Sequence, residues 1–167
     1  SFSQIGGVPE GVEVEPAIRL AAQLVESRPA ARIKVHWPQS IPAVLGSNVN
    51  LKQILGNIFI NAAEAIEATG RASGRIVVEA TETTHAGQRA LDIAITDDGE
   101  GIDPSLLARI FEKGFSTRRA RSGGLGLHWC ANTVNAMGGR LEAESKGRGQ
   151  GATLHLVLPL VVPAVGG

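Results

Sequence analysis

Apolar residues recur at helical spacing in three segments of the chain. In the segment 16–26, alanine, leucine and valine return every three to four residues, and Pro29 ends the helix that this pattern predicts. The longest such pattern covers residues 50–68 and stops before Gly70, and a third covers residues 125–137. The sequence therefore predicts three helices.

Five other segments have the composition and alternation of β-strands. The second and third are separated by a short loop around Ala86 and Gly87, which predicts a hairpin, and the last two flank a glycine-rich loop. Two hairpins, with helices before and between them, favour a largely antiparallel sheet covered on one face by helices over a doubly wound parallel fold. The expected strands cover residues 31–37, 75–83, 89–96, 140–145 and 152–158.

The length of the chain indicates one domain, and its basic and acidic residues balance. The chain has 167 residues, of which 16 are basic and 16 acidic, so we expect no nucleic-acid partner. The single Cys130 excludes an internal disulfide and effectively excludes a structural zinc site. Because no apolar stretch could span a bilayer and no secretory signal pattern is present, we expect a cytoplasmic location for this chain.

Glycine is over-represented, and 11 of the 21 glycines lie between positions 99 and 151. Asp97 ends a buried-looking strand and precedes Gly99 and Gly101, whose missing Cβ atoms would let a flat ligand approach the backbone. The Asp97 carboxylate could accept a hydrogen bond from the exocyclic amine of adenine, although an Asp-Gly turn with solvated acids fits the same residues. Pro104 stands where a dinucleotide-binding fingerprint requires a third glycine, and no Walker-type phosphate loop exists.

Two asparagines lie one turn apart on the longest predicted helix. Asn57 and Asn61 are at the flank of the apolar stripe, beside Ile54, and their amide oxygens could reach a ligand or a hydrated Mg²⁺. An ordinary pair of helix-surface amides would have the same spacing. Asn48 or Asn50 is the expected N-cap of this helix.

A basic, glycine-rich run without clear periodicity covers residues 109–124 and predicts a mobile loop. Residues 122–127, which begin at the end of this run, lead directly into a helix. The exposed amides and positive dipole end of that helix could bind a polyphosphate. A solvated basic loop with a glycine cap is the alternative interpretation.

In this order, the segments resemble the catalytic and ATP-binding domain of bacterial sensor histidine kinases, a member of the GHKL group of ATP-binding domains. The resemblance covers roughly residues 16–159. Its motifs are LKQILGNIFINAAEAIEA (51–68) for the asparagine box, DDGEGID (97–103) for the first glycine box, IFEKGFSTR (110–118) for the phenylalanine box, GGLGLHWCANTVNAMGG (123–139) for the second glycine box, and GRGQGATLHLVLP (147–159) for the closing segment.

The resemblance implies a two-layer α/β sandwich, in which a mixed, largely antiparallel five-stranded sheet lies under three helices. ATP would lie between the helical layer and a flexible lid. The implied kinase domain covers residues 16–160, preceded by a linker remnant and first strand region (1–15) and followed by a tail (161–167).

The resemblance also implies a role for individual residues. Asn61 would hold Mg²⁺ with help from Asn57, and Asp97 would bind the adenine amino group. The other implied contacts are Gly99, Gly101 and Ile102 at the base, Phe111 as the anchor of the lid, Lys113 and Arg118 as catalytic phosphate contacts, and Gly124, Leu125, Gly126 and Leu127 around the phosphates.

Two residues depart from the family pattern. Ser122 stands where the family commonly has glycine, which predicts a stiffer lid. Ala152 replaces a threonine often found near the adenine. Thr153 should point to the opposite face of the sheet, because neighbouring strand residues alternate, and so should not replace the missing hydroxyl.

The implied activity is transfer of the γ-phosphoryl group of Mg–ATP to a histidine on a separate two-helix dimerisation domain, with a response regulator downstream. No long helical hairpin precedes residue 16, so we expect this chain to bind ATP and ADP as a monomer without its phosphoacceptor. Two alternatives remain. One is a GHKL ATPase, disfavoured because Asn57 stands where those hydrolases carry a glutamate base. The other is a nucleotide-sensing module that transfers nothing.

Overall fold

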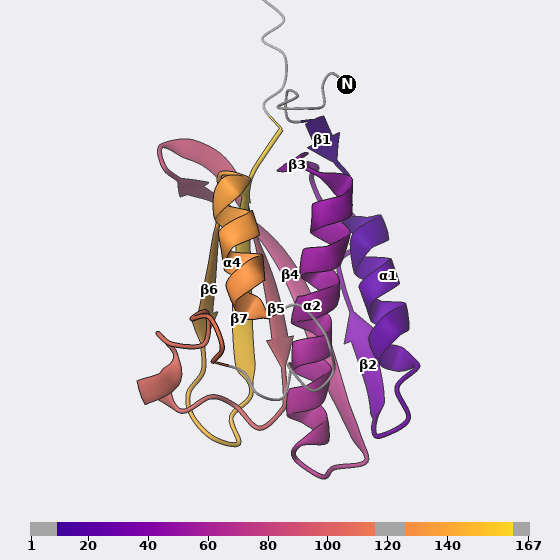
Figure 1. Cartoon of the computed structure of the whole chain (residues 1–167). Helices are drawn as coiled ribbons and strands as arrows, with labels where there is room; N and C mark the ends of the chain where they lie inside the picture. Colours follow the sequence, from indigo (N-terminus) through magenta and orange to yellow (C-terminus); the bar gives the residue numbers. More distant parts are fainter. Residues whose placement is uncertain (1–9, 116–125, 162–167) are drawn as a thin grey trace, which may run out of the picture.

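Two layers make up the structure, a computed structural model that describes residues 10–115 and 126–161. One layer is a five-stranded β-sheet, and the other consists of the three α-helices of the described residues, which lie on one face of that sheet (Figure 1). The helices are α1 (Glu15–Glu26), α2 (Asn48–Glu67) and α4 (Leu127–Ala136). The expected α/β sandwich is therefore confirmed.

The strand order of the sheet is β2-β4-β5-β7-β6. β2 and β4 are parallel, whereas the other neighbouring pairs are antiparallel, which confirms the mixed, largely antiparallel sheet. Ala86 and Gly87 form the β4–β5 turn, with positive φ angles of 53° and 78°, as a two-residue hairpin of type I′ requires. The strands are β2 (Arg32–His36), β4 (Ser73–His85), β5 (Gln88–Asp97), β6 (Arg140–Glu144) and β7 (Ala152–Pro159).

Helix α2 is the centre of the helical layer and is buried along most of its length. Its N-cap is Ser47, whose hydroxyl accepts a hydrogen bond from the backbone N–H of Asn50 at 3.2 Å. The expectation that Asn48 or Asn50 caps this helix is wrong, because both residues already lie in its first turn. The serine satisfies one of the N–H groups that the start of a helix leaves without a partner.

A small second sheet lies at the end of the molecule where Figure 1 shows α2 beginning. It pairs β1 (Glu10–Val12) with β3 (Val44–Gly46) in antiparallel register. The C-terminal end of β7 continues into it, since Val161 donates its backbone N–H to the carbonyl oxygen of Ala43 at 3.3 Å. The first and last described residues of the chain are thus held at one end of the fold.

The opposite end brings three segments together. Asp97, the last residue of β5, pairs in register with Ala152, the first residue of β7. The loop after β5 then turns to the C-terminal half of α2, where Glu100 donates its backbone N–H to the carbonyl oxygen of Ala65 at 3.0 Å. Polar side chains from both layers therefore converge at this end.

Candidate functional site

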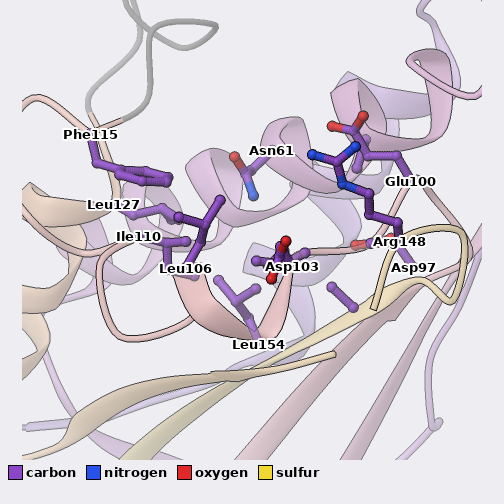
Figure 2. A pocket seen from close by; sticks show the side chains of 14 residues that line it. Asn61, Asp97, Glu100, Asp103, Leu106, Ile110, Phe115, Leu127, Arg148 and Leu154 are labelled. Atoms are coloured by element: carbon purple, nitrogen blue, oxygen red, sulfur yellow. The ribbon is translucent and has the colours of Figure 1, made fainter. Parts of the chain in front are cut away.

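A cavity of about 700 Å³ opens at this convergence (Figure 2). α2 forms one wall, the loop after β5 and the start of β7 form a second, and the segment after η1, a short 3₁₀ helix at Pro104–Leu106, forms a third. Its described lining residues are Asn61, Ala65, Asp97, Glu100, Gly101, Ile102, Asp103, Leu106, Ile110, Phe115, Leu127, Arg148, Ala152 and Leu154. Five of the residues to which the resemblance assigns a contact are among them: Asn61, Asp97, Gly101, Ile102 and Leu127.

Asp97 is the buried carboxylate of the cavity, with only 6% of its surface exposed. One carboxylate oxygen accepts a hydrogen bond from the backbone N–H of Gly99 at 2.8 Å. Burial raises the pKa of Asp97 from 3.8 to about 6; the Gly99 hydrogen bond opposes this rise, and the nearby charge of Asp98 adds to it. The site thus offers a recessed acceptor for an amine or amide N–H group.

The two glycines after Asp97 allow protein segments to approach one another. A Cβ on Gly99 would lie 2.6 Å from the carbonyl carbon of Ala65, and a Cβ on Gly101 would lie 2.1 Å from the carbonyl oxygen of Gly147. Gly101 also has a φ of +76°, which favours glycine. The missing Cβ atoms thus let α2 and the β6–β7 loop come close to this backbone, and the approach of a flat ligand to Gly99 and Gly101 stays a prediction.

The two asparagines of α2 have different surroundings. Asn61 lines the cavity from the helical layer (Figure 2). Asn57, one turn earlier, is 7% exposed and donates a hydrogen bond from Nδ2 to the carbonyl oxygen of Gln53 at 2.9 Å. Asn57 is not among the described lining residues, so its direct contact with a ligand stays a prediction.

The other end of the cavity is apolar. Leu106, Ile110, Phe115 and Leu127 lie together there (Figure 2). Leu127 is the first residue of α4, whose N-cap is Gly126, so the cavity also meets the N-terminus of a ten-residue helix. That helix end presents amide N–H groups and a positive dipole, which suit an anion.

Other residues singled out from the sequence lie beside the cavity or outside the described chain. Phe111 is half-buried against the core and Lys113 is exposed, and neither lines the cavity. Arg118, Gly124 and Leu125 fall outside the described residues, as do Ser122 and most of the expected lid. Their assigned roles stay predictions.

Ala152 and Thr153 lie on opposite faces of the sheet, as expected from the alternation of strand residues. Ala152 lines the cavity, whereas Thr153 lies on the opposite face of the sheet, where its hydroxyl is 2.8 Å from that of Thr96. Thr153 therefore does not replace the missing hydroxyl contact.

Sequence reasoning missed several charged and aromatic lining residues. Glu100 and Asp103 lie within the recognised first glycine box, and Phe115 within the phenylalanine box. Arg148 comes from the β6–β7 loop, where its place between Gly147 and Gly149 was the available signal. Glu100, Asp103 and Arg148 make the part of the cavity away from Phe115 strongly polar.

The donor set suits a metal that keeps most of its water. No group of three or more His, Cys, Asp and Glu side chains that could hold a metal occurs in residues 10–115 and 126–161. Asn61 supplies a neutral amide to the cavity wall, which fits a hydrated Mg²⁺ delivered by phosphates rather than one in a protein cage.

None of the helices in the described part of the chain has the length and apolar character needed to cross a membrane.

Comparisons with known proteins agree on one family. Residues 46–162 match the family described as histidine kinase-, DNA gyrase B- and HSP90-like ATPase. The C4-dicarboxylate transport sensor protein DctB of Pseudomonas aeruginosa is 35% identical over 94% of this chain, and sensor histidine kinase ZraS of Salmonella typhi is 32% identical over 87%. The chain spans 25% of DctB and 29% of ZraS.

Solved structures lead to the same family. The mycobacterial sensor histidine kinase MprB aligns with a TM-score of 0.74 and 25% identity, over 92% of this chain and 98% of that one. Full-length ShkA, solved with AMPPNP, aligns with a TM-score of 0.71 and 29% identity, over 96% of this chain and 34% of that one. The chain belongs to the histidine kinase-, DNA gyrase B- and HSP90-like ATPase family, as an ATP-binding catalytic domain of the sensor histidine kinase type.

Proposed function

We propose that this domain binds Mg–ATP and donates its γ-phosphoryl group to a histidine on a separate two-helix dimerisation domain. The observation that carries the proposal is that one cavity joins the buried Asp97 carboxylate, the Asn61 amide and the N-terminus of α4. These three features suit an adenine amine, a phosphate-bound metal and a phosphate group.

The proposed orientation follows from the places of these three features in the cavity. Adenine lies at the end formed by Asp97, Gly101 and Ile102, with the phosphates towards Asn61 and Leu127. Bound Mg²⁺ would neutralise phosphate charge, and Asn61 would hold it with Asn57 in support. Lys113, Arg118 and the backbone at 124–126 are proposed phosphate contacts, and Phe111 is the proposed anchor of a lid.

The proposal favours transfer over hydrolysis. Activation of water requires a side chain that can take a proton, and the amide of Asn57 cannot do so. Its Nδ2 is also engaged with the helix backbone through Gln53. Phosphoryl transfer instead depends on positioning and electrostatic stabilisation, which a separate acceptor domain would complete.

The proposed partners are ATP and ADP, the two-helix phosphoacceptor domain of the same protein, and a response regulator that receives the phosphoryl group. The names of the relatives, which describe sensor proteins and sensor histidine kinases, support this assignment. We further propose that the isolated chain is monomeric and works in the cytoplasm, where its nucleotide substrate is found.

Transfer in trans tests this proposal. The chain is incubated with γ-labelled ATP, with and without the two-helix domain of its own protein. We expect acid-labile label, typical of a phosphoramidate, on that domain, and only a trace of phosphate release by the chain alone. Rapid steady-state phosphate release, or stable label on this chain, would support the ATPase alternative. Nucleotide binding without transfer would support the sensing module.

A further inference from the structure

Arg148 lies at the polar end of the cavity. It comes from the β6–β7 loop, opposite the wall formed by α2, and its side chain lines the cavity (Figure 2). Figure 2 shows its guanidinium on the same side of the cavity as the Glu100 carboxylate. Among the described lining residues, Arg148 is the single cation, beside the carboxyl groups of Asp97, Glu100 and Asp103.

The backbone that carries Arg148 is held on both sides. Gly149 donates its N–H to the carbonyl oxygen of Glu100 at 2.6 Å. The Ser145 hydroxyl accepts hydrogen bonds from the N–H groups of Ile102 and Gly147, at 3.0 and 3.2 Å. These bonds attach the β6–β7 loop to the first glycine box, so the start of the Arg148 side chain has a fixed position over the cavity.

The charge of Arg148 also acts on the carboxyl group of Asp103. The pKa of Asp103 is held below its ordinary value, first by hydrogen bonds from the backbone and hydroxyl of Ser105 and in smaller part by the charge of Arg148. A cation here offsets part of the negative potential that the three carboxyl groups impose on an anionic ligand. Charge alone would be supplied equally well by lysine.

A guanidinium differs from the ammonium of lysine in having a flat face. Phe115, the aromatic residue among the described lining residues, lies with Ile110 and Leu127 at the apolar end (Figure 2). Ala65 of α2, which has a small side chain, also lines the cavity. A flat base placed against Ala65 would have one face towards α2, and its other face would be open to a guanidinium, a group that stacks on aromatic rings.

We propose that Arg148 is a further binding residue of this site, which stacks its guanidinium on the adenine ring. The inference rests on the proposed function, since it assumes that adenine lies beside Asp97. It assigns to the β6–β7 loop the outer wall of the base site, opposite α2.

The test compares Arg148→Ala and Arg148→Lys with Lys146→Ala, which removes an exposed cation from the same loop. Affinities for adenosine, ADP and ATP are measured by calorimetric titration. For Arg148→Ala we expect a loss of about 3- to 30-fold, the range of a cation–π contact, and of similar size for all three ligands. Arg148→Lys should recover only part of this loss, because its ammonium keeps the charge but lacks the planar face that stacks. Lys146→Ala should bind as the unmodified chain does.

Two outcomes would overturn the inference. A loss that grows from adenosine to ATP and is restored by lysine would make Arg148 a phosphate contact, and unchanged binding by Arg148→Ala would remove it from the site. Both leave the proposed function intact. If the unmodified chain itself fails to bind ATP, the proposed function fails with it.

Discussion

Nδ1 of His128 lies 3.1 Å from the carbonyl oxygen of Phe111. The other ring nitrogen, Nε2, lies 3.2 Å from Nδ2 of Asn132 on the next turn of α4. A neutral imidazole that carries its proton on Nδ1 satisfies both contacts, because Nδ1 then donates and Nε2 accepts. His128 thereby links the first turn of α4 to the segment that follows η1.

Replacement of His128 by alanine should remove this link. We expect His128→Ala to lower the free energy of unfolding by about 1 kcal/mol, the usual net contribution of a neutral hydrogen bond. Urea unfolding measures this loss of stability. Asn132→Ala is the control, since it leaves the contact with Phe111 in place and should cost less. Equal stability of His128→Ala and the unmodified chain would show that the link contributes nothing.

The Asp97 carboxylate should contribute strongly to nucleotide affinity. Asp97→Asn should weaken ADP binding by about 1.5 to 3 kcal/mol, the range for a hydrogen bond to a charged group. Calorimetric titration measures the change. Asp92→Asn is a matched control, because Asp92 lies on the same strand but faces His155 on the opposite side of the sheet. Unchanged affinity in folded Asp97→Asn would remove Asp97 from the site.

Asp97 should also make the stability of the nucleotide-free domain depend on pH. Its pKa is raised from 3.8 to about 6, so between these values the folded state binds more protons than the unfolded state. The contribution of Asp97 to stability should therefore fall as pH rises through this window, by up to about 3 kcal/mol. Urea unfolding at several pH values, with Asp97→Asn as the non-titrating reference, tests this. A constant difference between the two proteins would contradict the shift.

Asn61 should account for the metal dependence of binding. Asn61→Ala should abolish the gain in ATP affinity that Mg²⁺ produces, because the cavity wall loses its amide oxygen. ATP titrations with Mg²⁺ and with a chelator measure that gain. Asn57→Ala, whose side chain is bonded to Gln53, should reduce it less. A full Mg²⁺ effect in Asn61→Ala would show that the metal is held elsewhere.

Gly101 should tolerate no side chain. Gly101→Ala combines a strained φ of +76° with a Cβ placed 2.1 Å from the carbonyl oxygen of Gly147. Gly87→Ala is the control, since Gly87 has a similar φ of +78° but no heavy atom within 4 Å of the added Cβ. We expect Gly101→Ala to cost at least roughly 2 kcal/mol more than Gly87→Ala in urea unfolding. Equal losses of stability in the two variants would mean that the β6–β7 loop moves away from the added Cβ without cost.

Long periodic elements were predictable because they follow from local pattern. The stripe of α2, the alternation of β5 and the Ala86-Gly87 turn each depend on residues close in sequence, and all are in the structure. Strand β3 was not predicted. It has three residues and owes its conformation to pairing with β1, so no local period identifies it.

The same distinction applies to the site. Asp97 and Asn61 were predictable because their motifs are local, and both line the cavity. Arg148 lines it from a loop that the hydrogen bond between Gly149 and Glu100 helps to hold, a contact between distant parts of the chain. The packing of Gly99 against Ala65 likewise depends on how the loop folds back on α2. Neither contact can be predicted from the spacing of residues along the chain.

The small β1–β3 sheet makes the domain a candidate for insertion into another protein. A Cβ on Gly11 would lie 3.0 Å from a methyl carbon of Val161, so the two ends of the described fold are adjacent. Adjacent ends allow a domain to be spliced into a surface loop of a host. The end of β5 and the start of β7, which carry lining residues of the cavity, lie at the end of the sheet away from β1 and β3 (Figure 1), so the cavity would be remote from the splice. If residues 10–161 were inserted into a surface loop of a fluorescent protein, the cavity would therefore stay open to nucleotide.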